Sequence, residues 1–199
     1  MDETVPALAK IHQHITSIIP LEDFQWELIV NLLENKTLVK DDFFLKEGKV
    51  CDAIAFINKG TLIYYKDLEN GDQITNDFAF DGDWVTDNYS RLNNCPSLLN
   101  IKAIEETNLY IIKDSDLSEL YCKIPVLERL GRKVTEHFFL KMVGHNIDMQ
   151  TLSAKERYLK LLKNHPEIFQ RVPLYHIANY LGIAAKSLSR IRSEIFNNK

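Results

Sequence analysis

The 199-residue sequence predicts an α+β fold: an antiparallel β-domain, then a long helix, then a C-terminal helix-turn-helix. Three observations support this. Between residues 37 and 112, short apolar segments alternate with Gly and Asn turns, as in antiparallel sandwiches and barrels. Apolar residues then recur at spacings of three and four over about six turns. Finally, residues 174–195 hold two short helical stripes on either side of Gly182.

Residues 7–35 carry helical periodicity before the strands begin. One stripe is Ile11, Ile15 and Ile18; a second includes Phe24 and Leu28, and the acidic pair at 22–23 favours a helix start there. Strands are expected at 37–39, 43–45, 53–57, 62–66, 74–80, 101–104 and 109–112. Asn70-Gly71 predicts a tight hairpin turn in which both central residues have positive φ.

A long helix is expected after residue 123. Its apolar stripe is Leu127, Leu130, Val134, Phe138, Met142, His145 and Met149. The length favours packing against a twin helix as well as against its own subunit, while burial within one chain is the alternative. Ser153 and Glu156 form a capping box, so a new helix starts there, after a hinge near residues 149–153.

The segment 174–195 has the pattern of a helix-turn-helix. Ile177, Ala178 and Leu181 share one face of its first helix; Gly182 suits the turn because glycine adopts positive φ at low cost. The second helix buries a stripe of its own. It directs polar and basic side chains outward, of the types that reach phosphates and base edges in a major groove. The alternative is an ordinary helical hairpin whose charges only keep it soluble.

The string HIANYLGIAAKSLSRIR, residues 176–192, resembles the helix-turn-helix of the Crp/Fnr family of bacterial transcription regulators. EGKVCDAIAFINKGTLIYY, FAFDGDWV and IKAIEETNLYIIKDSDL resemble, in order and spacing, a cyclic-nucleotide-binding β-roll. The resemblance implies a β-roll sensor domain with N-terminal helices over 1–122, a dimerisation helix over 123–150 and a DNA-binding domain over 151–199. Because the chain ends four residues after Ile195, no C-terminal wing is expected.

The resemblance also implies DNA contacts. Lys186, Ser187, Ser189 and Arg190 are expected near base edges, with Arg190 the best candidate to bind guanine. Ala185 and Lys186 stand where the family often has Arg or Pro and then Glu, so the usual operator is not assumed. The expected phosphate contacts are Arg192, Lys155, Arg157, Tyr175 and His176.

The family's cyclic-nucleotide site uses a Gly-Glu pair for the ribose and an Arg-Ser pair for the phosphate. Gly82, Asp83 and Trp84 resemble the first element, with Asp in place of Glu. The second should fall near residues 96–100, which offer Ser97 and Asn100 but no arginine; Arg91 is nearest, in an expected loop. Met142 replaces a threonine that some relatives use. Burying a phosphodiester removes its hydration, and without a cationic partner no charge-assisted hydrogen bond offsets that loss of free energy. We therefore expect a β-roll without cyclic AMP, and either another small-molecule effector or none.

Composition sets the remaining expectations. Residues 151–199 hold nine Lys or Arg against three Asp or Glu, a net of +6, and because the whole chain carries −4, residues 1–150 carry −10. DNA contact is therefore expected in the C-terminal quarter. Cys51, Cys95 and Cys122 form no CxxC pair, so neither a disulfide framework nor a metal site is expected.

The sequence carries no catalytic motif, membrane span or signal peptide, and predicts a cytoplasmic non-enzyme without a cofactor. The expected partners are double-stranded DNA, a second copy of the chain and RNA polymerase. The alternative is a small-molecule-binding sensor whose helical tail makes protein contacts.

Overall fold

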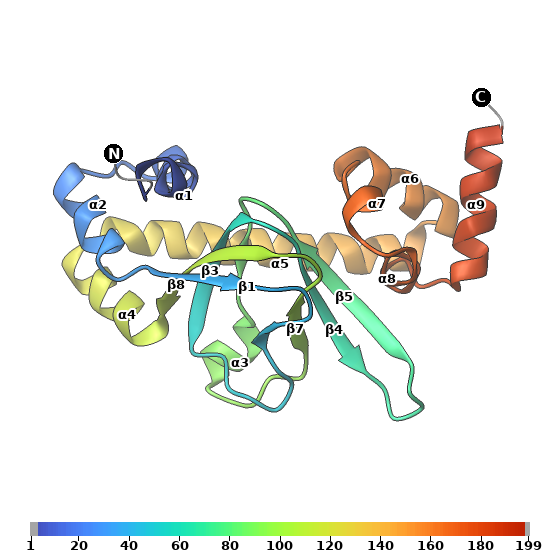
Figure 1. Cartoon of the computed structure of the whole chain (residues 1–199), viewed down its shortest axis with the longest axis horizontal. Coiled ribbons are helices and arrows are strands. Elements are labelled where there is room, and N and C mark those ends of the chain that lie inside the picture. The colour runs from blue at the N-terminus through green and yellow to red at the C-terminus, as the bar shows by residue number, and fades with distance from the viewer. Residues whose placement is uncertain (1–3, 198–199) are drawn as a thin grey trace. The chain divides into compact units, whose positions relative to one another are not determined.

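The computed structural model of the chain describes the backbone of residues 4–197 and the side chains of residues 8–195 (Figure 1). The helices are α1 (Thr4–Ile18), α2 (Asp23–Val30), α3 (Asn88–Asn93), α4 (Asp114–Lys123), α5 (Val126–Thr151), α6 (Ala154–Asn164), α7 (Ile168–Arg171), α8 (Leu174–Tyr180) and α9 (Ala185–Asn197). The strands are β1 (Glu34–Leu38), β2 (Phe43–Leu45), β3 (Ala53–Lys59), β4 (Leu62–Asp67), β5 (Gln73–Ala79), β6 (Trp84–Val85), β7 (Asn100–Ala103) and β8 (Thr107–Lys113). The predicted α+β fold is confirmed.

Two four-stranded sheets form the β-domain, with strand orders β1-β8-β3-β6 and β2-β7-β4-β5. In the first sheet β8 pairs antiparallel with both β1 and β3, and Ile54 lies opposite Ile112. Side chains alternate across a strand, so Ile54, Phe56 and Ile112 face the helices while Ala55 faces away. The sequence did not predict β6 or α3, because both are too short to show a period.

Helices α1, α2, α4 and the first half of α5 pack on this helix-facing side of the sheet. Ile11 and Ile15 of the predicted α1 stripe are buried there. The second predicted stripe is wrong in its phase: Phe24 is 58% exposed, while Ile29 of α2 is buried. The N-terminal helices also end earlier than predicted, because residues 34–35 pair with β8 as part of β1.

The loop between β4 and β5 differs from the predicted two-residue turn. The Leu68 amide donates to the Asp72 carbonyl at 2.8 Å, closing a three-residue loop over 69–71. Gly71 has φ +84°, but Asn70 does not have a positive φ. One glycine in the left-handed region suffices for a loop of this length.

Two compact units emerge from the contacts within the chain. The first comprises residues 1–63 and 78–138, and the second comprises residues 64–77 and 139–199. The second unit thus combines most of the β4–β5 hairpin with the second half of α5 and helices α6–α9. This grouping follows three-dimensional contacts and does not coincide with the predicted division along the chain.

Candidate nucleic-acid interface and effector cluster

Helices α8 and α9 form the helix-turn-helix at the C-terminal end of the second unit (Figure 1). Helices α8 and α9 pack against each other, and Ile177, Leu181 and Leu188 are each at most 2% exposed. Gly182 has φ +67°, as its place in the turn predicts, and the Ile183 amide donates to the Ala178 carbonyl at 3.0 Å. The turn therefore fixes α9 against α8.

The outward face of α9 holds the predicted base-reading residues. Lys186, Ser189 and Arg190 are exposed, as is Ala185 at the first position, while Ser187 is half-buried. The Ser189 hydroxyl donates to the Ala185 carbonyl at 3.1 Å. The first two turns of this face therefore combine two cations with a hydroxyl group, and Glu194 follows Arg190 one turn further along the helix.

The N-terminal turn of α8 places its two predicted phosphate contacts differently. Tyr175 is 51% exposed, but His176 is only 1% exposed. His176 Nδ1 lies 2.9 Å from the Thr75 hydroxyl of the hairpin. A buried imidazole cannot reach a phosphate in this conformation, so His176 has a packing role that the sequence did not predict.

A second hydrogen bond fastens the hairpin to α8. The Asn179 side-chain amide donates to the Gln73 carbonyl at 2.6 Å, and Lys141 of α5 pairs with Asp77 at 2.8 Å. We call the Thr75–His176 and Asn179–Gln73 hydrogen bonds the hairpin clasp. Its partners lie about a hundred residues apart in the chain, which is why no local pattern could have revealed it.

Three other predicted phosphate contacts are basic residues near the helix-turn-helix. Arg157 donates to the Leu181 carbonyl at 2.9 Å and to the Leu152 carbonyl, so it braces the turn. Lys155 lies 3.8 Å from Glu194. Arg192 is half-buried, and its Nε donates to no described residue. Of the three, Lys155 presents its ammonium group most openly, with a side chain 50% exposed.

The predicted effector residues do not converge on one site. Gly82 and Asp83 form a turn, in which the Phe80 amide donates to the Asp83 carboxylate at 2.8 Å and Gly82 has φ +90°. Asn100 accepts from the Glu47 amide at 3.0 Å. Trp84 is buried on the helix-facing side, and Met142, in the second unit, is 64% exposed. The Asp83 and Asn100 side chains thus accept hydrogen bonds from nearby backbone amides.

Ser97 instead meets a residue that the sequence reading missed. Its hydroxyl donates to the Asp87 carboxylate at 2.6 Å, and Asp87 caps α3 by accepting from the amides of Tyr89 and Ser90. Both side chains are buried. Asp is a favoured N-cap residue, so its place directly before a short helix is the sequence signal that could have identified Asp87. The cluster is therefore anionic.

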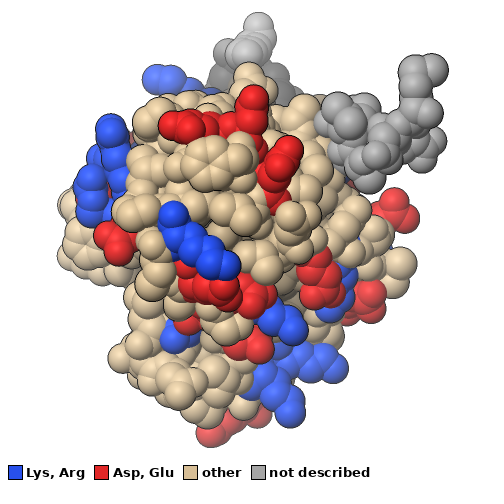
Figure 2. Space-filling view, turned by 90° about the vertical axis from the view of Figure 1, so that its left-hand side faces the viewer, with Lys and Arg blue, Asp and Glu red and all other residues tan. Residues whose placement is uncertain are grey.

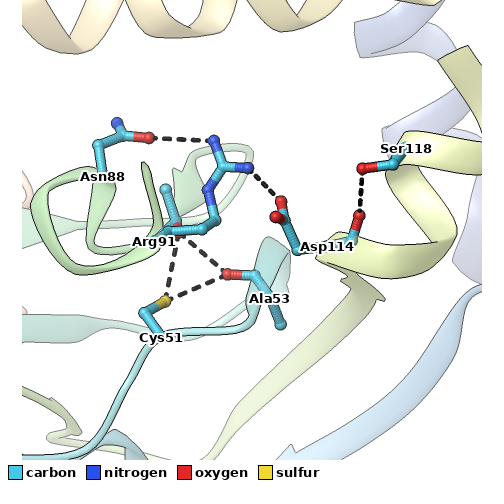
Figure 3. Close-up of polar contacts among 7 residues, drawn as sticks. Cys51, Ala53, Asn88, Arg91, Asp114 and Ser118 are labelled. Atoms are coloured by element: carbon cyan, nitrogen blue, oxygen red, sulfur yellow. Dashed lines mark hydrogen bonds and ion pairs between the residues drawn. The ribbon is translucent and has the colours of Figure 1, made fainter. Parts of the chain in front are cut away.

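Arg91 is the arginine nearest to this cluster, and it lies in α3 rather than in the predicted loop. Its guanidinium donates to the Asp114 carboxylate and, at 3.3 Å, to the Asn88 side chain (Figure 3). The positive charge is thus already balanced. The Asp87–Ser97 cluster does not fit a cyclic phosphate, which needs an unshared cation.

The second half of α5 exposes an apolar stripe. Phe139 and Met142 are 58% and 64% exposed, and Asn146 and Met149 continue the stripe at spacings of four and three. The predicted stripe shares Met142 and Met149 with this one. Its other members are not exposed: Leu127, Leu130 and Val134 are buried in the first unit, and His145 stacks on Tyr180, with ring centroids 4.4 Å apart. We call Phe139, Met142, Asn146 and Met149 the exposed α5 stripe.

Charge on the remaining surface is mixed where it is drawn. The face in Figure 2 intersperses Lys and Arg with Asp and Glu side chains, so no single sign dominates it. Among the described residues, no helix combines the length and the hydropathy needed to cross a bilayer.

Residues 35–123 match the cyclic nucleotide-binding domain family. Among solved structures, FixK2 from Bradyrhizobium japonicum is similar, with a TM-score of 0.73 and 18% identity over 83% of this chain and 85% of that one. A Eubacterium rectale protein assigned to the Crp/Fnr family of transcriptional regulators gives a TM-score of 0.67 and 19% identity, over 88% and 84% of the chains.

The chain has a Crp/Fnr-like fold. The c-di-GMP-responsive global regulator CLP of Xanthomonas campestris shares this fold at 10% identity, with a TM-score of 0.69 over 89% of this chain and 93% of that one. No curated protein sequence matches the chain. The Crp/Fnr-like fold confirms the predicted resemblance, whereas DNA binding, effector binding and the residues assigned to them stay predictions.

Proposed function

We propose that this Crp/Fnr-like protein is a homodimeric, sequence-specific DNA-binding transcription regulator whose roll does not take cyclic AMP. The observation that carries the proposal is the outward face of α9. There Lys186, Ser189 and Arg190 are exposed on a helix whose Leu188 is buried, next to the buried Leu181 that precedes the turn. Arginine can donate two hydrogen bonds to O6 and N7 of guanine, which makes Arg190 the principal base contact.

Dimerisation would supply the second reading helix. The exposed α5 stripe has the alternating three-four spacing of a coiled-coil seam, which buries its apolar side chains against a twin. Asn146 lies within this seam, and a polar Asn in such a position fixes the register of two parallel helices. A two-fold dimer places two α9 helices in successive major grooves about one DNA turn apart.

The charges around Ser97 disfavour cyclic AMP. The Asp87 carboxylate lies against Ser97, and Arg91 is committed to Asp114. A cyclic phosphate next to Asp87 would meet a like charge in a buried setting, which is costly.

A regulator of this type would work in the cytoplasm with RNA polymerase, and any effector would be a different small molecule.

The test of DNA reading uses the full-length protein. Bound sites are selected from random duplexes, and the dissociation constant is measured for the selected duplex and for a scrambled one. Arg190→Ala should cost about 1–3 kcal/mol on the selected duplex and relax one base position. Arg129→Ala, which removes an exposed arginine of α5, should change neither value.

Other outcomes separate the alternatives. An equal loss on both duplexes would assign Arg190 to phosphate contact. If the protein binds no duplex at any salt concentration, the proposal fails, and the helical tail is better explained by protein contacts. Binding with a steep salt slope is the expected result, because basic side chains release counterions from DNA.

A further inference from the structure

An apolar cavity of about 380 Å³ lies within the first unit, between the helix-facing side of the β1-β8-β3-β6 sheet and the helices packed on it. We call it the interlayer cavity. Ile54 and Ile112 form part of its sheet wall, and Leu120, Leu127 and Leu130 belong to its helix walls. Its volume falls within the range of small-molecule sites.

The interlayer cavity is not the predicted effector site. Trp84 lines it, but Gly82, Asp83, Ser97, Asn100 and Met142 do not. The Asp87–Ser97 cluster is also absent from its lining. A molecule here would sit outside the roll, against helices α3, α4 and α5.

Two buried hydrogen-bond donors in this lining have no acceptor. Trp84 Nε1 and Arg91 Nε are buried, and neither donates to any described residue. Buried N–H groups are nearly always paired, because leaving one unpaired forfeits its hydration without compensation. Two such donors in the lining of one cavity indicate that an acceptor belongs there.

The charges around the interlayer cavity define what kind of acceptor fits. The Arg91 side chain is 11% exposed, and its guanidinium already pairs with Asp114 (Figure 3). The other charged lining residues, Glu128 and Arg132, have opposite signs. An incoming anion would therefore find no uncompensated cation and would keep its desolvation cost.

We propose that the interlayer cavity binds an uncharged, mainly apolar molecule whose carbonyl-type oxygen accepts from Trp84 Nε1 and Arg91 Nε. The apolar body would pack against the leucine and isoleucine walls. Leu127, Leu130, Val134 and Phe138 of α5 also line the cavity, so the ligand would touch the helix whose second half carries the exposed α5 stripe. The proposal does not depend on DNA binding.

Three probes of nearly equal shape test the ligand class. They are 2-acetylnaphthalene, which has a carbonyl, 2-ethylnaphthalene, which has none, and 2-naphthoate, which is charged. Each is titrated into the full-length, ¹⁵N-labelled protein while the indole N–H resonances are followed. The chain has two tryptophans, and Trp26 does not line the interlayer cavity, so its resonance serves as an internal reference.

The expected result is a downfield shift of the Trp84 indole proton with the ketone and tightest binding for the ketone. Trp84→Phe should weaken ketone binding about fivefold to tenfold, the usual worth of one hydrogen bond, and leave ethylnaphthalene binding unchanged. Equal affinity for ketone and hydrocarbon would overturn the role of the two donors. Tighter binding of naphthoate would overturn the uncharged class.

If Trp84→Phe does not fold, the wild-type titration still decides the matter. No movement of the Trp84 resonance with any of the three probes, up to their solubility limits, would overturn the proposal. A downfield shift of the Trp84 indole proton with the ketone, without such a downfield shift with the hydrocarbon, would support it without the variant.

Discussion

Single residues in this protein carry roles that their type alone does not specify. His176 and Arg157 are basic residues near α9, the proposed DNA-reading helix, yet one is buried against Thr75 and the other braces the turn through the Leu181 carbonyl. Arg190, in contrast, is exposed, and among the described residues it makes neither kind of contact. The difference lies in what surrounds each side chain, and only the structure reveals it.

His145 should make stability depend on pH. Burial lowers the pKa of His145 below its usual 6.5, and this outweighs the opposing effect of Asp77 and Asp148. The unfolded chain therefore takes up its proton first as pH falls below about 6.5, so the free energy of unfolding should fall there. Urea titrations between pH 7.5 and 5.5 should show a shallower decline for His145→Gln.

Histidine ring NMR gives the direct check. The His145 resonance should titrate below pH 6.5 in the folded protein. A midpoint above 6.5 would contradict the assignment. Because burial also lowers the pKa of His14, the decline should be smaller again in a double variant with His14→Gln.

Elements were predicted well where one stripe of residues decides their packing. The helix-turn-helix and most strands needed only local periodicity, and Gly182 marked the turn. The second stripe of the N-terminal helices failed because period alone does not say which of two adjacent faces is covered, and Phe24 proved exposed. Short elements such as β6 and α3 arise from pairing and capping, which no period records.

The exposed α5 stripe yields a test of assembly. Phe139→Glu should convert a dimer to a monomer, because it places a charge in the apolar seam. Leu140→Glu is the matched control: Leu140 is 66% exposed, and it points about 100° away around the helix. Analytical ultracentrifugation at several concentrations measures the outcome. Equal effects from both variants would argue against this seam.

At the scale of the whole molecule, the family match and the chemistry of the roll diverge. Residues 35–123 match a domain family described by cyclic-nucleotide binding, but the Asp87–Ser97 cluster is anionic. The missing arginine was visible in the sequence. The Asp87 contact was not, because Ser97 reaches it only after the loop that follows α3 folds back. Likewise, no local sequence pattern predicts that Thr75 and His176 come together.

Cyclic AMP should therefore leave the whole protein unchanged. Isothermal titration should detect no low-micromolar binding, and the unfolding temperature should not rise, since a ligand that binds the native state stabilises it by mass action. The matched comparison is the same cyclic AMP titration of the Asp87→Asn variant, which removes the carboxylate charge but keeps a hydrogen-bonding side chain at this position. Micromolar binding by the unmodified protein would refute the proposal.

The hairpin clasp has a practical consequence for anyone who wishes to study the proposed DNA-binding part in isolation. The chain passes between the two units three times, at residues 63–64, 77–78 and 138–139. A fragment beginning at residue 139 would carry α8 and α9 but would lose the hydrogen bonds to Thr75 and Gln73. No single cut yields the second unit intact, so a truncated protein that fails to bind DNA would be uninformative unless residues 64–77 were grafted back.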